Sequence, residues 1–197
     1  MERLHEWAVG LASESTDHAS QALAAVDLLA EVRREALRDP LTGGGNRAAL
    51  QLRAEEEHRR RGGVLDGLTL LFVDLDGFKA VNDTHGHAVG DELLVQLGSR
   101  LLGVVRASDL VARIGGDEFV LLFPDVEPDV VERLVRNVRG VFANPYRVGR
   151  DEHRLDGSVG VSRAPDHGRS FEELMHHADT AMYRAKRARQ HTDRVWF

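Results

Sequence analysis

The sequence predicts an α+β domain with a ferredoxin-like βαββαβ core, a mostly antiparallel central sheet surrounded by helices, and an N-terminal helical extension. Segments with the apolar period of a helix alternate along the chain with short apolar runs typical of strands. Two of those runs, LVARI and FVLLF, are separated only by GGDE. They are therefore expected to form a hairpin, which makes them antiparallel.

Residues 1–38 differ in character from the rest of the chain. Small and apolar residues recur there at alternating spacings of four and three, which is typical of a coiled-coil seam. The seam positions are Leu4, Ala8, Leu11, Ser15, His18, Ala22, Ala25, Leu29, Val32 and Ala36. We interpret this segment as a dimerisation stalk that could also receive an unseen sensor or partner. One amphipathic helix packed on the domain, or the last helix of an upstream module, would give a similar pattern.

A second unit is expected over residues 39–197. DPLTGGGNR ends the first helix, because Pro40 and three glycines cannot continue it. Asn46 is expected to cap a helix running to about Arg61, whose end, HRRR, is expected to be solvated. LTLLFVD then predicts a buried strand, and DGFKAVNDTHGHAVGD is expected to be irregular or only briefly helical.

The remaining elements follow the same logic. DELLVQLGSRLLGVV and PDVVERLVRNVRGVF have helical apolar periods on either side of the hairpin. HRLDGSVGVS is expected to be a strand, FEELMHHADTAMYRAKRARQ a helix, and RVWF a closing edge strand.

Composition narrows the class of protein. The 197 residues carry a net charge of −6, which argues against a protein that coats nucleic acid. The chain has no cysteine, so disulfides, thiolate metal sites and a cysteine nucleophile are excluded. No apolar run is long enough to span a bilayer, and the N-terminus lacks the apolar core of a signal peptide. These features together predict a cytoplasmic protein without a membrane segment.

Acidic residues stand where the predicted sheet ends. In RIGGDEF, Gly115 and Gly116 fit a two-residue turn with positive φ, and Asp117 and Glu118 beside it would be solvated in an ordinary hairpin. Asp74, however, ends the run LTLLFVD, where a buried acid is costly unless it is paired or bound to a cation. If that strand neighbours the hairpin, the carboxylates converge. Two carboxylates and a backbone carbonyl form a site suited to Mg²⁺.

A phosphate site is expected next to these acids. LDGFK places backbone N–H groups where a helix would begin, with Lys79 in its first turn, and such a terminus favours phosphate. An ordinary strand-to-helix connection would have the same pattern. A metal site and a phosphate site together indicate phosphoryl chemistry on a nucleotide.

Over roughly residues 39–197 the chain resembles the GGDEF family of diguanylate cyclases. Five family motifs occur in the family's order: DPLTGGGNR, DLDGFKAVNDTHGHAVGD, RASDLVARIGGDEF, DGSVGVS and ADTAMYRAK. The resemblance implies a palm-type version of the predicted fold and the conversion of two GTP into cyclic di-GMP and two pyrophosphates. It also implies Mg²⁺ or Mn²⁺ as cofactor and a homodimer in which each protomer binds one GTP.

The resemblance further implies roles for single residues. Asp74 and Asp117 would be the carboxylate metal ligands, with the carbonyl of Leu75, and Glu118 would assist the metal or help to activate the ribose 3′-hydroxyl. Asn82 would read the guanine edge. The other residues implied in substrate binding are Gly115 and Gly116 against the nucleotide, Asp91 at the guanine, and Phe78, Lys79 and Lys186 at the phosphates.

Arg106 and Asp109 match the family's RxxD motif, where cyclic di-GMP binds and inhibits. An Arg fork suits phosphate or a guanine edge, and Asp suits guanine. A surface Arg–Asp pair at a helix end is the simpler alternative. His85 and His87 are expected to form loop hydrogen bonds rather than a metal site, since no third ligand stands nearby.

Three positions depart from the family pattern. Gly44 replaces the second Leu of LTGL and is expected to loosen the start of the domain. Asp156 and Gly157 stand in the usual TxSxG motif, where a strand glycine weakens the strand. The family's AKxxGR reads AKRARQ here, so Gln190 stands where the resemblance implies a phosphate-binding Arg. Arg187 or Arg189 could substitute, although adjacent helix positions point about 100° apart.

We expect an active cyclase, with two alternatives. A catalytically weak module would bind cyclic di-GMP or GTP and signal through its N-terminal helix. Another nucleotidyl cyclase on a related palm-like fold would prefer ATP.

Replacing Gln190 with Arg is expected to lower the KM for GTP, because a guanidinium would restore charge at the expected phosphate contact. Steady-state kinetics of both proteins measures this effect. Unchanged kinetics would show that Gln190 does not limit substrate binding.

Overall fold

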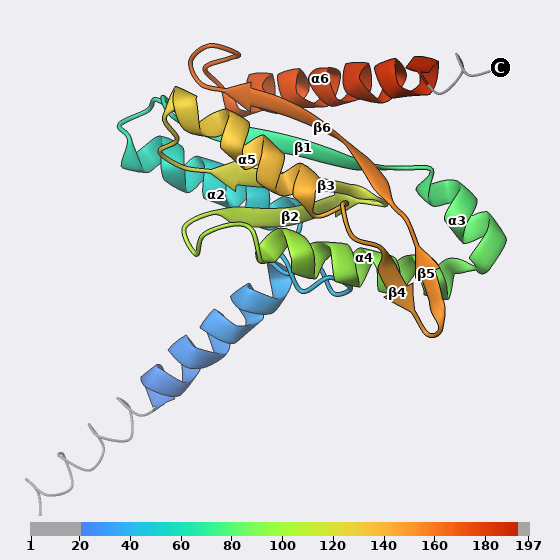
Figure 1. The fold of residues 1–197 in the computed structure, drawn as a ribbon. Helices are drawn as coiled ribbons and strands as arrows, with labels where there is room; N and C mark the ends of the chain where they lie inside the picture. The colour runs from blue at the N-terminus through green and yellow to red at the C-terminus, as the bar shows by residue number, and fades with distance from the viewer. Residues whose placement is uncertain (1–20, 193–197) are drawn as a thin grey trace, which may run out of the picture. The chain divides into compact units, whose positions relative to one another are not determined.

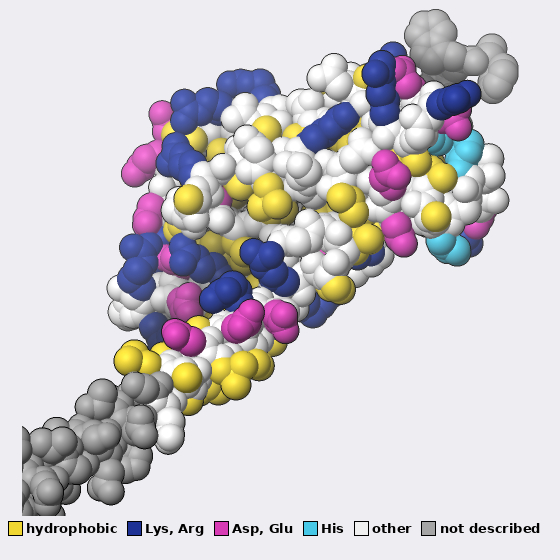
Figure 2. All heavy atoms as spheres, turned by 90° about the horizontal axis from the view of Figure 1, so that it is seen from below, with side chains coloured by type: hydrophobic (Ala, Val, Ile, Leu, Met, Phe, Trp, Pro, Cys, Tyr) yellow, Lys and Arg dark blue, Asp and Glu magenta, His cyan; other side chains and the backbone are white. Residues whose placement is uncertain are grey.

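The computed structural model describes residues 21–192, with side chains described up to Ala188. The chain divides into two units, residues 1–37 and residues 38–197. In the first unit, residues 21–36 are helical and exposed (Figure 1). Leu29 and Val32 of the predicted seam are 67% and 54% exposed, and Figure 2 shows hydrophobic side chains on the surface of this helix. The seam positions from Leu4 to His18 lie outside the described residues.

The second unit contains the sheet (Figure 1). Its elements are α2 (Arg47–Arg60), β1 (Thr69–Asp76), α3 (Phe78–His85), α4 (His87–Leu102), β2 (Leu110–Gly115), β3 (Glu118–Phe123), α5 (Pro128–Gly140), β4 (Tyr146–Val148), β5 (Asp151–His153), β6 (Asp156–Arg163) and α6 (Phe171–Thr192). The main sheet has the order β2-β3-β1-β6, and each neighbouring pair is antiparallel. The predicted βαββαβ core with an antiparallel sheet is confirmed.

Two apolar layers cover the sheet. Strand β1 is central and buried, and its alternate residues face opposite layers. Val73 packs in the layer formed with α4 and α5. Phe72 packs in the layer formed with α2 and α6. Among the described residues, no helix is both long enough and apolar enough to cross a membrane.

The segment that follows β1 is more regular than the sequence indicated. Residues 78–85 form α3 and α4 begins at His87, so the expectation of an irregular or briefly helical stretch is wrong. Gly77 and Gly86 delimit α3, with φ of +76° and +86°, a region that favours glycine. A helix of about two turns between two glycines has too few apolar positions to show a period.

Other local predictions have mixed outcomes. Asn46 caps α2 as predicted, since its Oδ1 accepts a hydrogen bond from the Ala49 N–H at 3.0 Å. The small hairpin of β4 and β5 was not predicted, because three-residue strands rich in charge lack an apolar alternation. The predicted edge strand RVWF lies outside the described residues.

The end of α2 is exposed at His58, Arg59 and Arg60, as expected, and it also carries an ion-pair network that was not predicted. The Glu57 side chain is 2% exposed and forms ion pairs with Arg53, Arg60 and Arg61. Arg60 and Arg61 also pair with Asp125, in the loop after β3. Burial alone would raise the pKa of Glu57, but the hydrogen bonds from Arg60 and Arg61 and the charge of Arg53 outweigh burial and lower it. The network joins the end of α2 to the loop that follows β3.

Replacing Glu57 with Gln is expected to lower the free energy of unfolding at pH 7 by about 1–3 kcal/mol, because three guanidinium groups lose a buried, charged acceptor. The depressed pKa means that ionised Glu57 stabilises the fold above about pH 4.5, its unfolded value. That stabilisation is lost as the pH falls through the folded pKa.

Urea unfolding at pH 7 and at about pH 3.5 measures this dependence, with Glu55→Gln on the exposed side of α2 as the matched control. The difference from wild type should shrink at the lower pH. An equal difference at both values would show that ionisation of Glu57 is not the source of the stability.

Candidate active site

The hairpin between β2 and β3 places the predicted acids at its turn. The two-residue turn is Gly116–Asp117, not the predicted Gly115–Gly116, because Gly115 is still paired with Glu118 in the ladder. The register shifts between Arg113 and Gly115, and Gly116 has φ +45°. Asp117 therefore lies in the turn itself.

Antiparallel pairing aligns the acids across three strands. Asp74 of β1 lies opposite Glu118 of β3 and opposite Ser158 of β6, so the three side chains share one face of the sheet. This is the face that carries Phe72 and packs on α6. One step along, the Ser158 hydroxyl donates to both carboxylate oxygens of Asp76, at 3.1 and 3.0 Å. Strand β1 thus neighbours the hairpin, which was the condition set for the convergence of the acids, and Asp74 lies beside Glu118 in a row of polar side chains.

Helix α6 brings a cation to this row. A β-carbon on Gly160 of β6 would lie 2.0 Å from the Ala178 carbonyl oxygen and 2.2 Å from the Met182 nitrogen. Only glycine therefore allows α6 to run directly along β6. Further along the helix, the Lys186 ammonium donates a hydrogen bond to the Asp74 carboxylate and forms an ion pair with it.

Burial and neighbouring negative charge raise the pKa values of two carboxyl groups at the site. Burial and the charge of Asp74 raise the pKa of Asp117. Burial, followed by the charges of Asp74, Asp117 and Asp179, raises that of Glu118. Burial opposes the charge of Lys186, but the hydrogen bond and charge of Asp74 outweigh it and raise the pKa of Lys186. Carboxylates that repel one another fit a bound divalent cation.

The donor set fits a metal shared with a substrate. No group of three His, Asp or Glu side chains able to hold a metal alone was found among the described residues. Asp74, Asp117 and the carbonyl of Leu75 would supply three oxygens at one end of β1. Mg²⁺ commonly takes one or two carboxylates and completes its shell with water and substrate phosphates.

Two arginines that were not predicted hold the hairpin. Arg113 Nε donates to the Gly116 carbonyl at 2.8 Å, and its Nη1 lies 3.4 Å from Asp39 Oδ2. Asp39 in turn accepts hydrogen bonds from the Thr42 N–H and hydroxyl, both at 2.8 Å. Arg47 Nη2 donates to the Ile114 carbonyl at 3.1 Å. Arg113 and Arg47 each stand beside a family motif, which is the one sequence feature that could have indicated them. Their partners Asp39 and Ile114 lie too far away in the chain to be predicted from the sequence.

Two departures from the family motifs are accommodated locally. The Gly44 carbonyl accepts a hydrogen bond from the Asp39 N–H at 2.9 Å, and a β-carbon on Gly44 would lie 3.1 Å from the Val111 carbonyl oxygen. The loop is therefore closed rather than loosened as expected. At Gly157, a β-carbon would lie 2.4 Å from the ring of Phe142, and β6 continues through this residue. Gly157 makes room for the ring.

The residues implied in nucleotide binding follow β1 directly. Gly77 begins α3, so Phe78 and Lys79 lie in its first turn. Gly90 of α4 contacts both the Phe78 ring and the Asn82 side chain, since a β-carbon there would lie 3.1 and 1.9 Å from them. Asn82 thus lies against α4 at the residue before Asp91, which is exposed.

The RxxD turn lies at the other end of β2. Asp109 Oδ2 accepts from the Arg106 N–H at 2.8 Å, and Oδ1 accepts from the Ser108 hydroxyl at 3.2 Å. Arg106 is exposed. His85 does not form the expected loop hydrogen bonds with a neighbour in sequence; its ring meets that of His153 edge-on, with centroids 4.9 Å apart.

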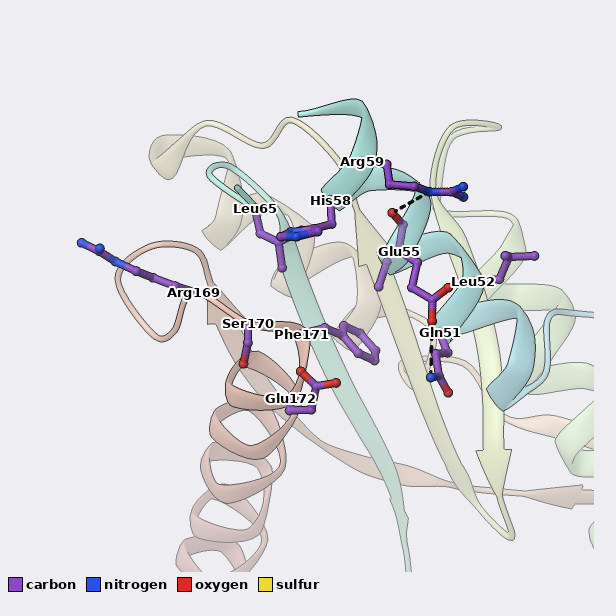
Figure 3. Close-up of a pocket in the computed structure, with 11 residues that line it drawn as sticks. Gln51, Leu52, Glu55, His58, Arg59, Leu65, Arg169, Ser170, Phe171 and Glu172 are labelled. Atoms are coloured by element: carbon purple, nitrogen blue, oxygen red, sulfur yellow. Dashed lines mark hydrogen bonds between the residues drawn. The ribbon is translucent and has the colours of Figure 1, made fainter. Parts of the chain in front are cut away.

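Hollows flank the hairpin, and a larger cavity lies elsewhere. One hollow of about 370 Å³ is lined by Arg47, Arg113 and both hairpin glycines. A cavity of about 570 Å³ lies between α2 and the start of α6, with the Phe171 ring pointing into it (Figure 3). None of the predicted site residues lines that cavity, so it is separate from the acids.

Known proteins with the same motifs resemble this chain over most of its length. The model of the diguanylate cyclase GGDEF domain matches residues 36–192. The chain is 43% identical over 162 residues to the bifunctional diguanylate cyclase/cyclic di-GMP phosphodiesterase MucR of Pseudomonas aeruginosa, covering 80% of this chain. It spans only 24% of that relative's length.

Two solved structures have the same fold. The diguanylate cyclase SiaD of Pseudomonas aeruginosa, in complex with its activator SiaC, is 33% identical with a TM-score of 0.75, over 95% of this chain and 72% of that one. The coiled coil and GGDEF domain of DgcB from Caulobacter crescentus, in complex with c-di-GMP, is 29% identical with a TM-score of 0.75, over 90% and 95% of the two chains. With the motifs, the fold and the family match in agreement, the chain belongs to the GGDEF family of diguanylate cyclases.

Proposed function

We propose that this chain is an active diguanylate cyclase, which condenses two GTP into cyclic di-GMP and two pyrophosphates across a homodimer. The observation that carries the proposal is the row of Asp74 and Glu118, with Asp117 in the adjoining turn and Lys186 above Asp74. Each ribose 3′-oxygen would form a bond to the α-phosphorus of the other GTP, while the bond to pyrophosphate breaks. Family members named as diguanylate cyclases support this reaction.

Asp74, Asp117 and the Leu75 carbonyl would hold Mg²⁺ or Mn²⁺. When bound, the metal would offset phosphate charge and lower the pKa of the attacking hydroxyl. Glu118 would take the proton of that hydroxyl, since neighbouring negative charge and burial raise its pKa. The Phe78 amide and the ammonium groups of Lys79 and Lys186 would bind the phosphates.

Selection of GTP would depend on Asn82 and Asp91. An aspartate can accept from guanine N1–H and from the exocyclic amine, which adenine does not offer in that pattern. A site built for such donors discriminates strongly against a base that lacks them. Asn82 lies against Gly90, the residue that precedes Asp91 in α4, which supports a joint role.

Dimerisation and feedback complete the proposal. The exposed Leu29 and Val32 support pairing of two copies through residues 1–38, and a sensor or activator could act on that helix. Arg106 and Asp109 would bind the product cyclic di-GMP and inhibit the enzyme. A catalytically weak receptor module with the same turn is the alternative, and the intact hairpin favours the enzyme.

Incubation of the purified chain with GTP and Mg²⁺ is expected to yield cyclic di-GMP and pyrophosphate, resolved by chromatography and mass spectrometry. Glu118→Gln should lower turnover at least about a hundredfold, as expected for loss of a general base, whereas Glu132→Gln on exposed α5 should match wild type. ATP should not be turned over. No product at high protein concentration, with tight binding of cyclic di-GMP retained, would favour the receptor alternative.

Removing residues 1–36 is expected to lower both the dimer fraction and the turnover per chain, because two half-sites must meet. Light scattering and rate measurements over a range of protein concentration follow both quantities. Leu29→Asp should reproduce part of the loss, whereas Leu28→Asp, which flanks the seam and is similarly exposed, should have a smaller effect. Unchanged mass and rate after truncation would remove the proposed role of the segment.

A further inference from the structure

Helix α2 contacts the turn that carries Arg106 and Asp109. Arg53 Nη2 donates a hydrogen bond to the Ser108 carbonyl at 3.0 Å. The same guanidinium lies 3.0 Å from Glu57 Oε1, one helical turn further along α2. Sequence reasoning gave Arg53 no role, because 55 residues separate it from Ser108.

The Arg53 side chain is held in place. Its partner Glu57 is 2% exposed, whereas the Arg53 side chain is 33% exposed. Arg60 and Arg61 also pair with Glu57, which fixes the carboxylate from two further directions. A planar guanidinium can donate to a carboxylate and to a carbonyl at the same time. Arg53 therefore connects a fixed, buried anion to the backbone of the turn.

The bond acts on one peptide unit within the RxxD motif. The Ser108 carbonyl belongs to the Ser108–Asp109 peptide, and the N–H of the same planar unit donates to the Arg106 carbonyl at 3.0 Å. Both polar groups of that peptide are thus bonded on opposite sides. This fixes the direction in which the Asp109 side chain leaves the backbone, and Asp109 in turn accepts the Arg106 N–H.

We propose that Arg53 is a positioning residue for the inhibitory site: it orients the Ser108–Asp109 peptide so that Arg106 and Asp109 meet cyclic di-GMP in a preformed geometry. This inference rests on the proposed function, in which that turn binds the product. Loss of the guanidinium leaves the turn free to adopt other conformations, and product binding then has to restore the order.

Isothermal titration of the full chain with cyclic di-GMP tests the proposal. Arg53→Met keeps the aliphatic stem and is expected to weaken the Kd about tenfold, the effect of one hydrogen bond to a charged donor. Arg53→Lys keeps the charge on a shorter side chain whose ammonium ends short of the Nη2 position, so its Kd should lie between those of Arg53→Met and wild type. Arg150→Met, in the exposed turn between β4 and β5, removes the same charge elsewhere and should bind like wild type.

Kinetic measurements separate positioning from a merely structural role. The product inhibition constant of Arg53→Met should rise by the same factor as its Kd, while the initial rate and KM for GTP, measured before product accumulates, stay at wild-type values. A structural role alone would lower thermal stability and the initial rate and leave the Kd unchanged, which would overturn the proposal.

Separate results would disprove the inhibitory site at Arg106 and Asp109 and the role of Arg53. If wild type binds no cyclic di-GMP, or if Arg106→Ala binds it as well as wild type, then the inhibitory site itself is wrong. If wild type binds through Arg106 and Arg53→Met binds equally tightly, then only the role of Arg53 is wrong.

Discussion

The close approach of α6 to β6 at Gly160 is the constraint on which the candidate site depends. Asp74 of β1 and Glu118 of β3 lie side by side at the site, and α6 supplies the cation, Lys186, that pairs with Asp74. Lys186 lies eight residues beyond Ala178, about 12 Å along the helix axis. A helix displaced by even one methyl group at Gly160 would move that ammonium relative to Asp74. The missing side chain on β6 thus sets the position of a charge on α6.

The site holds several acids close together, two of them on a hairpin that neighbouring arginines keep in place. Burial and the charge of Asp74 raise the pKa of Asp117 and of Glu118, and the charge of Lys186 offsets only part of this rise at Asp117. The hairpin that carries Asp117 and Glu118 is held from outside, by Arg113 on the Gly116 carbonyl and by Arg47 on the Ile114 carbonyl. Rigid support around crowded acids is typical of sites that await a cation and a substrate.

Structural features that depend on one local sequence pattern could be predicted from the sequence. The succession of helices and strands along the chain follows from apolar periods and turn spacing, and the Asn46 cap follows from a capping side chain. The hairpin register did not follow, because either Gly115–Gly116 or Gly116–Asp117 gives a two-residue turn, and a shift at Arg113 decides between them. Long-range ion pairs could not be predicted either, because Asp125, which pairs with Arg60 and Arg61 at the end of α2, lies far along the chain.

The departures from the family motifs separate into two kinds when the packing is considered. A β-carbon on Gly157 would meet the Phe142 ring, so that ring fills the space of a larger side chain. At Gly44 a β-carbon would lie 3.1 Å from the Val111 carbonyl oxygen, and the Gly44 carbonyl closes the loop by accepting from the Asp39 N–H. Gln190 differs, since the change removes a charge rather than a volume. If this position contacts a phosphate, as the resemblance implies, packing cannot replace the missing charge, and only a nearby cation such as Arg187 or Arg189 could.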